Sequence, residues 1–403
     1  MSTIYNDNNV YILGAGFSRL AGLPLIKDFM NKMRDTHERL EGYIKSDKLT
    51  NDRKAKIERL LTAVAQVFEY RLKASSVNYR VNIDLENIEQ LFSLASLSND
   101  EGLEHNIRRA ICATIEGTYE LFYRPEYDKS KRIVRKTEEY IRKAEKNEFD
   151  FSQGFFPTDN INFLKTELYT FVLSNLIGSS NLHPEQNSFI TLNYDTIVER
   201  SLINLGLSFT YGISTHIHNP KTPSKYRNNG GIKVMKLHGS TNWIEAKDNS
   251  QSKNSGNIEV FPNFFNLAYD EIRDYTPLVL PPTWNKSAKG FLLDVWQDAI
   301  VAIRNATRII VIGYSFSTTD NHINYLIAEG LRENISLRSI HIWDTSPKKV
   351  VENWSSLTPY SKSIIKEVPF NENENEVSLA KGKDIYKSIN RGSSLEFIGK
   401  EML

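Results

Sequence analysis

The chain has 403 residues, with 50 lysines and arginines against 49 aspartates and glutamates and a formal net charge of +1. This length exceeds the usual single-domain size, so we expect either one domain with a large insertion or two domains. The charge balance excludes a global field that would steer the protein toward nucleic acid or a membrane. The single cysteine, Cys112, excludes an intrachain disulfide and a multi-cysteine zinc site.

The N-terminal residues 1–7 lack the basic start and long apolar core of a signal peptide. No apolar run elsewhere reaches membrane-spanning length. A lone cysteine is typical of a reducing compartment. The sequence therefore predicts a soluble, cytoplasmic protein without a membrane partner.

The first predicted strand, Val10 to Leu13, runs into the turn Gly14-Ala15-Gly16-Phe17-Ser18, with Gly22-Leu23-Pro24 shortly after. Glycines at both ends of the triplet let the backbone approach a pyrophosphate and expose amides to it. A following helix would add its positive N-terminal end. The pattern predicts a bound dinucleotide, although a turn of this kind also serves to pack a helix closely onto a sheet.

A long polar and helical stretch follows, which we interpret as an insertion over residues 31–185. Apolar residues at helical spacing predict amphipathic helices over residues 54–72, 83–96 and 104–123. The last of these holds Cys112 among apolar neighbours, so we expect a buried, inert thiol. The charged run 124–150 alternates in sign, which favours a solvated helix or linker over a nucleic-acid patch.

From residue 186 the chain alternates strand-like and helix-like segments. The expected strands are Phe189–Asn193, Ile232–His238, Pro277–Leu280, Ile309–Gly313 and Ile340–Asp344, and the expected helices are Thr196–Leu205, Phe291–Asn305 and Asp320–Glu333. This alternation, with near-continuous apolar strands, predicts an α/β fold with a doubly wound, Rossmann-like parallel sheet. We assign residues 1–30 and 186–350 to that domain.

The remaining residues, 351–403, form a C-terminal tail that packs on the domain or at an oligomer interface. Residues 364–370 could add an edge strand to the sheet, and residues 371–376 form an acidic polar turn. Asn, Ser, Gln and Lys dominate residues 248–257 within the domain, which predicts an exposed loop.

Small or polar residues close several of the predicted strands. They are Thr191 to Asp195, Lys236 to Ser240, Gly313 to Ser315 and Asp344 to Ser346. Ligands bind at the carboxyl ends of the strands in an open parallel sheet. We therefore expect these segments and the glycine turn to converge on one crevice.

Asn193 and Asp195 occupy alternate positions near a strand end, where an amide and a carboxylate can bind ribose hydroxyls, a carboxamide or a water. The alternative is a pair of turn-forming residues. His238 precedes Gly239 at another strand end and can act as a base toward a hydroxyl or water, although many lone histidines are structural. The pair His216 and His218 lacks a third ligand at suitable spacing, so no metal is expected.

Together these segments resemble the sirtuin superfamily, and more closely its bacterial sirtuin-like branch than the protein deacylases. The glycine turn is similar to the family's first cofactor motif, Thr191-Leu192-Asn193-Tyr194-Asp195 to its Asn-x-Asp motif, and Leu237-His238-Gly239 to its histidine motif. The resemblance implies NAD as ligand, with Asn193 orienting the nicotinamide ribose and a water, Asp195 near the carboxamide and His238 as base. It also implies phosphate or ribose contacts for Gly313 and Ser315, and an adenosine-ribose contact for Asp344.

Two departures from the deacylases bear on the reaction. Deacylases of this family carry a four-cysteine zinc ribbon after the histidine motif, whereas this chain has one cysteine that lies before it. The Asp-Phe-Arg run of their proline motif is also absent, because Asp28-Phe29 is followed by Met30. We therefore expect water, held by Asn193 and activated by His238, to capture the ribose, which makes the reaction NAD hydrolysis.

A freely running NAD hydrolase would harm its host, and sirtuin-like hydrolases of bacterial antiviral systems are held idle until a partner signals infection. By this analogy we expect a homo-oligomer formed through the helical insertion and an activating protein partner, with a HerA-type ATPase as a candidate. Direct nucleic-acid binding is not expected. Two alternatives stay open: transfer of ADP-ribose to protein or deacylation, and a non-catalytic module that senses NAD or ADP-ribose.

Overall fold

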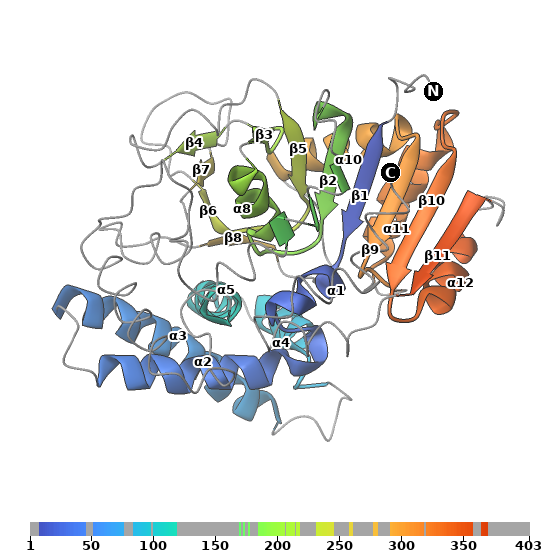
Figure 1. Ribbon diagram of the computed structural model, residues 1–403. Helices are drawn as coiled ribbons and strands as arrows, with labels where there is room; N and C mark the ends of the chain where they lie inside the picture. The colour runs from blue at the N-terminus through green and yellow to red at the C-terminus, as the bar shows by residue number, and fades with distance from the viewer. Residues whose placement is uncertain are drawn as a thin grey trace, which may run out of the picture.

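Parallel strands form the central sheet of the protein, with β1 in the middle (Figure 1). The computed structural model describes residues 8–45, 51–75, 84–97, 100–118, 169–170, 172–173, 176–177, 184–205, 207–213, 215–217, 231–245, 258–260, 277–280, 291–317, 320–357 and 364–369. The strands of this sheet are β1 (Asn9–Leu13), β2 (Asn187–Thr191), β3 (Phe209–Thr210), β5 (Ile232–Lys236), β9 (Arg308–Ile312), β10 (Ser339–Asp344) and β11 (Ile365–Pro369).

The order of the strands, β11-β10-β9-β1-β2-β5-β3, reverses direction at β1. The chain passes from β1 to β2 and fills that side of the sheet, then returns to β9 on the other side of β1. This is the doubly wound, Rossmann-like α/β sheet that the sequence predicts. The crevice outside the carboxyl ends of β1 and β9 is the switch point at which such sheets bind ligands.

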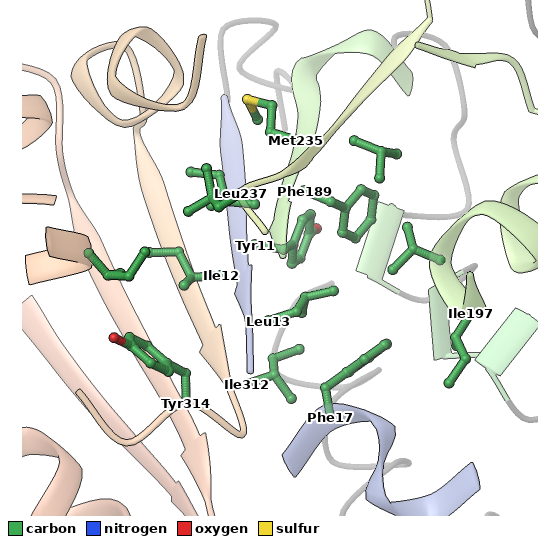
Figure 2. Close-up of a cluster of buried hydrophobic side chains, with 14 of the residues drawn as sticks. Tyr11, Ile12, Leu13, Phe17, Phe189, Ile197, Met235, Leu237, Ile312 and Tyr314 are labelled. Carbon is green, nitrogen blue, oxygen red and sulfur yellow. The ribbon is translucent and has the colours of Figure 1, made fainter. Parts of the chain in front are cut away.

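The central strands are buried on both faces, which explains their apolar sequences. Val10 to Leu13 of β1 and Ile309 to Ile312 of β9 are all buried. Tyr11 pairs in register with Phe189 of β2, and the two rings stack with centroids 4.8 Å apart. Figure 2 shows these rings in the cluster that continues through Leu13 toward Phe17, where the strand gives way to the turn. The core therefore extends to the floor of the switch point.

Among the described residues, four helices cover the sheet, and the first three of them were predicted from the sequence whereas α12 was not. They are α8 (Ile197–Asn204), α10 (Phe291–Arg304), α11 (Asn321–Arg332) and α12 (Pro347–Leu357). The first three lie within a residue or so of the expected ranges. α10 packs on β5, and α12 packs on β10 and β11. β11 forms the edge strand expected for residues 364–370, so the sheet continues beyond residue 350.

A second, smaller sheet was not expected. It consists of β4 (Thr215–Ile217), β6 (Gly239–Glu245), β7 (Ile258–Val260) and β8 (Pro277–Val279), in the order β4-β7-β6-β8. The prediction that 277–280 belongs to the parallel sheet is wrong, because β8 pairs antiparallel with β6. A strand of three residues that begins with proline suits the edge of a small sheet, since proline cannot donate to a ladder.

The helical insertion lies beneath the sheet in the view of Figure 1, on the side where β1 runs into the turn. Its described helices are α2 (Phe29–Ile44), α3 (Asn51–Ser75), α4 (Ile88–Ser96) and α5 (Glu101–Glu116). α4 begins at Ile88 because the Asn87 side chain caps it, and Asp100 caps α5 in the same way. The predicted features over 124–150, 248–257 and 371–376 lie outside the described residues.

Cys112 is buried within α5, as expected, and burial raises the pKa of its thiol well above the ordinary value. A thiol in that environment stays protonated and unreactive. In the part of the chain that the structure describes, no helix combines the length and apolarity needed to cross a membrane.

Candidate active site

One cavity of about 520 Å³ lies at the switch point of the parallel sheet. Its lining includes every site residue predicted from the sequence: Gly14, Ala15, Gly16, Phe17, Ser18, Asn193, Asp195, His238, Gly313, Ser315 and Asp344. These residues lie at or just after the carboxyl ends of β1, β2, β5, β9 and β10. Segments far apart in the sequence therefore meet around one space, and the volume lies in the range of small-molecule and cofactor pockets.

The glycines of the first turn allow it to touch the turn that follows β9. Gly14 N donates to Ile312 O at 3.1 Å, and Gly16 N donates to Gly313 O at 3.0 Å. A Cβ atom on Gly14 would lie 2.5 Å from the Gly313 oxygen, and one on Gly16 would lie 2.7 Å from the Gly313 Cα. Gly313 itself has φ +62°, which favours glycine. The floor of the cavity thus consists of two backbones in contact.

The helix after this turn, α1 (Ala15–Ser18), is a single turn. Phe17 N donates back to Gly14 O at 3.0 Å, so the amides of Gly14, Gly16 and Phe17 are all used within the protein. Ala15 is the exposed residue of the turn. Tyr169, from the far end of the insertion, holds the turn by donating to Phe17 O at 2.6 Å. So short a helix contributes little dipole to an anion, and the turn acts mainly through its shape.

Asn193 uses both hydrogens of its side-chain amide inside the protein. Nδ2 donates to Gly14 O at 2.8 Å and to Ser18 Oγ at 2.9 Å. The Gly14 carbonyl can only accept, so the atom facing it is the amide nitrogen. Oδ1 is therefore the atom that Asn193 offers to a ligand, as a hydrogen-bond acceptor. The backbone amide of Asn193 donates to Thr191 Oγ1 at 3.1 Å and not to a neighbouring strand, and β2 ends at Thr191, two residues before the expected end of the strand.

Asp195 fixes the direction of this hydrogen-bond chain. Its Oδ2 accepts from Ser18 Oγ at 2.6 Å, and its Oδ1 accepts from Ile197 N at 3.1 Å. Because the Ser18 hydroxyl donates to a carboxylate, its oxygen must accept from Asn193. Asp195 is 8% exposed and both carboxylate oxygens have protein donors. In this structure the carboxylate orients Ser18 and Asn193.

His238 has one ring nitrogen anchored to the backbone. Nδ1 lies 3.2 Å from Leu192 O, and since a carbonyl can only accept, Nδ1 carries the hydrogen. In the neutral ring, Nε2 then holds the lone pair. The side chain is 6% exposed, and Nε2 is shielded from solvent. With a neutral ring, His238 therefore offers Nε2 as an acceptor beside the segment that carries Asn193.

The smaller sheet holds the backbone of His238 in place. Gly239 has φ +82°, and a Cβ atom there would lie 2.0 Å from Leu278 O, so glycine is required for β8 to approach. Leu280 N donates to His238 O at 2.7 Å. β6 and the end of β8 therefore hold the histidine backbone in place.

Aromatic residues that sequence reasoning missed surround His238. Tyr194 lies 6.2 Å from it between ring centroids, and His322 of α11 lies 5.9 Å away. Trp296 of α10 stacks on His322 at 5.6 Å and donates to Leu237 O at 3.0 Å. His322 and Trp296 belong to amphipathic helices, whose patterns carry no signal that distinguishes a residue beside the site from an ordinary core residue.

Tyr194 also lines the cavity and is anchored at its tip, where its hydroxyl donates to Leu280 O at 2.6 Å. Burial raises the pKa of this phenol well above its ordinary value. Tyr194 therefore remains a neutral donor.

The exits of β9 and β10 complete the polar side of the cavity. Ser315 is exposed, and its carbonyl oxygen accepts from Asn353 at 2.8 Å. Phe316, the next residue, has φ +52°, an uncommon conformation for a bulky side chain, and its ring packs on Trp354 at 5.0 Å. Asp344 accepts through Oδ1 from Ser346 N at 2.9 Å. The contacts of Ser315 and Phe316 fix the β9 exit against α12, and the Asp344 bond closes the turn between β10 and α12.

Acidic groups dominate the charged residues of the described lining, which are Glu89, Asp195, Asp320, Asp344 and Lys27. Burial, followed by the charge of Asp320, raises the pKa of Tyr314 far above its ordinary value. Such a lining attracts hydroxyl donors and cationic rings more than anions.

The helical insertion supplies an apolar wall opposite these polar groups. Apart from Glu89 and Tyr169, its residues in the lining are Ile88, Phe92, Ile111, Ile115 and Val172. They come from α4, α5 and the described residues around 172, and all are buried. The cavity therefore has one mainly polar side formed by the sheet and one mainly apolar side formed by the insertion, with Glu89 as the charged residue of the insertion side.

Metal binding was not expected, and the described residues contain no group of three or more histidine, cysteine or acidic side chains placed to hold a metal ion. His216 lies in β4, whereas His218 lies outside the described residues.

Comparison with known proteins found no matching family model and no matching curated protein. Solved Sir2 structures match over most of the chain. A structure described as the basis for the mechanism and regulation of Sir2 enzymes is 11% identical, with 95% of this chain and 94% of that chain covered and a TM-score of 0.38. Sir2Tm bound to a propionylated peptide is 12% identical, with 94% and 93% covered and a TM-score of 0.33. These values describe a distant likeness, so function is argued from the cavity.

Proposed function

We propose that the protein is an NAD hydrolase that cleaves NAD to nicotinamide and ADP-ribose. The observation that carries the proposal is the pair of fixed acceptors, Asn193 Oδ1 and His238 Nε2, on two neighbouring segments of one cavity. A water has two hydrogens to donate. Two acceptors that hold those hydrogens leave an oxygen lone pair directed at an electrophile.

The chemistry of the lining fits the parts of NAD. The apolar wall suits the nicotinamide ring, and the acidic lining suits its positive charge. The carboxylate of Asp344 suits the adenosine-ribose hydroxyls. Ala15 and Ser315 are exposed, so the diphosphate lies near them, where solvent screens its charge. Gly14, Gly16, Phe17 and Gly313 shape the floor beneath it.

The proposed reaction breaks the bond between the nicotinamide nitrogen and the anomeric carbon of its ribose. The bonding electron pair leaves with the nitrogen and neutralises its positive charge. The water oxygen bonds to the anomeric carbon, and one water proton passes to His238 Nε2 and then to solvent. Asn193 holds the water or the ribose hydroxyl, and His238 acts as general base.

Hydrolysis is favoured over transfer to a protein acceptor because the insertion supplies one wall of the cavity. Five buried apolar residues of α4, α5 and the neighbouring described segment line the cavity on that side, which favours a small nucleophile such as water over a long acceptor side chain. Deacylation or ADP-ribosylation of protein is the second candidate. Radiolabelled NAD separates the two, since transfer leaves label on protein whereas hydrolysis leaves it in free ADP-ribose.

We further propose that the enzyme is a regulated effector of bacterial antiviral defence. In this proposal the cytoplasmic enzyme is a homo-oligomer formed through the insertion, and a protein partner such as a HerA-type ATPase activates it. A buried His238 Nε2 supports a resting state that a partner must open. Size-exclusion chromatography and activity assays with and without the partner test this. A monomer that is fully active alone contradicts it.

The proposed activity is tested by incubating the purified protein, alone and with candidate partners, with NAD and measuring nicotinamide and ADP-ribose. Asn193→Ala and His238→Ala should each lower kcat by about 1,000-fold. Arg332→Ala, which changes an exposed residue of α11 outside the cavity lining, is the control and should not lower it. Turnover retained in both cavity variants would exclude this site.

A sensing module is favoured if His238→Ala binds NAD normally and keeps its biological effect.

A further inference from the structure

A fully buried lysine lies between the two proposed catalytic segments. Lys236 ends β5, two residues before His238, and its side chain is 0% exposed. Its Nζ lies 3.0 Å from Glu199 Oε1 on α8 and also donates to the backbone oxygen of Asp195. Glu199 in turn accepts from the Tyr211 hydroxyl at 3.2 Å. A buried ammonium requires such partners, because lysine is almost never fully buried unless it is paired.

Backbone contacts alone already align the two segments, 191–195 and 236–241. Leu237 N donates to Thr191 O at 3.1 Å, and Thr241 N donates to Tyr194 O at 3.0 Å. Between these two bonds, the Lys236 ammonium donates to the backbone oxygen of Asp195. Asp195 is the residue whose carboxylate orients Ser18 and Asn193. It therefore links β5, the exit of β2 and α8 at one point.

We propose that Lys236 and Glu199 form a positioning pair that sets the placement of Asn193 relative to His238; the kinetic part of this inference rests on the proposed hydrolase function. Lys236 acts through Asp195 and does not line the cavity. A buried ion pair of this kind adds little net stability over an apolar pair of the same shape, because desolvation offsets the attraction. What the pair contributes is a fixed geometry.

The test removes both charges while keeping the volume. In Lys236→Met combined with Glu199→Gln, the glutamine keeps an acceptor for the Tyr211 hydroxyl, so the double variant should fold with a melting temperature near that of the wild type. We expect kcat to fall by about 100-fold, the loss typical of a small misplacement of reacting groups. KM should change by less than about twofold, because no residue that lines the cavity is altered.

Two control variants separate positioning from general damage. Lys233→Met makes the same substitution on the same strand, at a half-exposed lysine that pairs with Asp298 at 3.1 Å, and should leave kcat unchanged. Lys236→Met alone leaves the Glu199 charge buried without its ammonium, so it should lower the melting temperature by about 5–10 °C. A double variant with wild-type kcat overturns the proposal.

Hydrogen exchange provides a readout that does not depend on activity. In the double variant the amides of Leu237 and Thr241 should exchange at least about tenfold faster than in the wild type, because the segments that they join are held less firmly. If the wild-type protein releases no nicotinamide under any condition, the hydrolase proposal fails and exchange decides the structural part. Unchanged exchange at both amides then overturns the positioning pair.

Discussion

The two walls of the cavity are built on different principles. The sheet side consists of strand exits whose side chains form directional hydrogen bonds, such as the chain from Gly14 O through Asn193 and Ser18 to Asp195. The insertion side consists mainly of buried apolar side chains from α4, α5 and the described residues around 172. A hydrogen bond is lost when one of its atoms is changed, whereas the free energy gained from apolar contacts declines gradually with the apolar area that is buried. Substitutions on the two sides should therefore have different kinetic effects.

The largest effect is expected from Asn193→Asp, which changes one atom on the sheet side and keeps the size of the residue. A carboxylate oxygen would replace Nδ2 opposite Gly14 O. Both oxygens are acceptors, so the hydrogen bond is lost. The side chain must turn away, so the water or hydroxyl loses its holder. We expect kcat for nicotinamide release to fall by about 1,000-fold. Activity above a tenth of wild type would show that the direction of this bond is unimportant.

A smaller loss is expected from Ser18→Ala, which breaks the link between Asn193 and Asp195. The variant keeps Asn193 bonded to Gly14 O, so we expect kcat to fall by about tenfold and the free energy of unfolding by about 1–3 kcal/mol. Ser93→Ala on α4 is the matched control, because the Ser93 hydroxyl bonds the carbonyl of Glu89 on its own helix. Urea denaturation and steady-state kinetics measure both variants. Equal kcat in the two would contradict the role given to Ser18.

The sheet side was largely predictable from sequence, because strand exits carry a recognisable signal. Apolar runs that end in glycine or in Asn, Asp, Ser and His marked β1, β2, β5, β9 and β10, and topology places such ends at one edge. The direction of the hydrogen bonds was not predictable. Asp195 was expected near a ligand carboxamide, whereas here both of its carboxylate oxygens accept from the protein.

The insertion side and the smaller sheet were poorly predictable for a physical reason. Apolar spacing reveals which face of α4 or α5 is buried but not whether it faces a core or a cavity. β4, β6 and β7 form a sheet with β8 through pairings distant in sequence, which short strands do not reveal. α2 was missed although Phe29, Met30, Met33 and Leu40 are buried along it.

On the insertion side, Ile111→Ala should act on binding more than on chemistry. Ile111 lines the cavity and is 4% exposed. Truncation of Ile111 would remove apolar contact to the nicotinamide ring of bound NAD, so we expect KM to rise by about tenfold with kcat nearly unchanged. The free energy of unfolding should fall by about 2–5 kcal/mol. Leu60→Ala on α3, a buried position outside the cavity lining, should lose comparable stability with an unchanged KM. If Ile111→Ala lowers kcat and Leu60→Ala does not, the two walls do not differ in their kinetic effects.

The smallest effect on activity is expected from His341, which lies inside the sheet and lines neither wall. Burial, followed by the charges of Arg308 and Lys366, lowers its pKa from 6.5 to about 4. The unfolded chain therefore takes up this proton near pH 6.5, while the folded protein resists it until about pH 4. Because the unfolded state binds more protons in that window, His341 destabilises the fold as the pH falls through it.

Replacement of His341 by a residue that does not titrate isolates this contribution. Between pH 7 and pH 5, urea denaturation of the wild type should show a loss of stability that is greater by about 2 kcal/mol than in His341→Asn. The nearby buried Trp343 offers a fluorescence signal for unfolding. At pH 7 the histidine of the folded protein is neutral, so nicotinamide release by His341→Asn should equal that of the wild type. If the free energy of unfolding depends on pH identically in the two proteins, His341 is hydrated in solution. If His341→Asn loses activity at pH 7, the sheet interior affects the polar wall and the two cannot be treated separately.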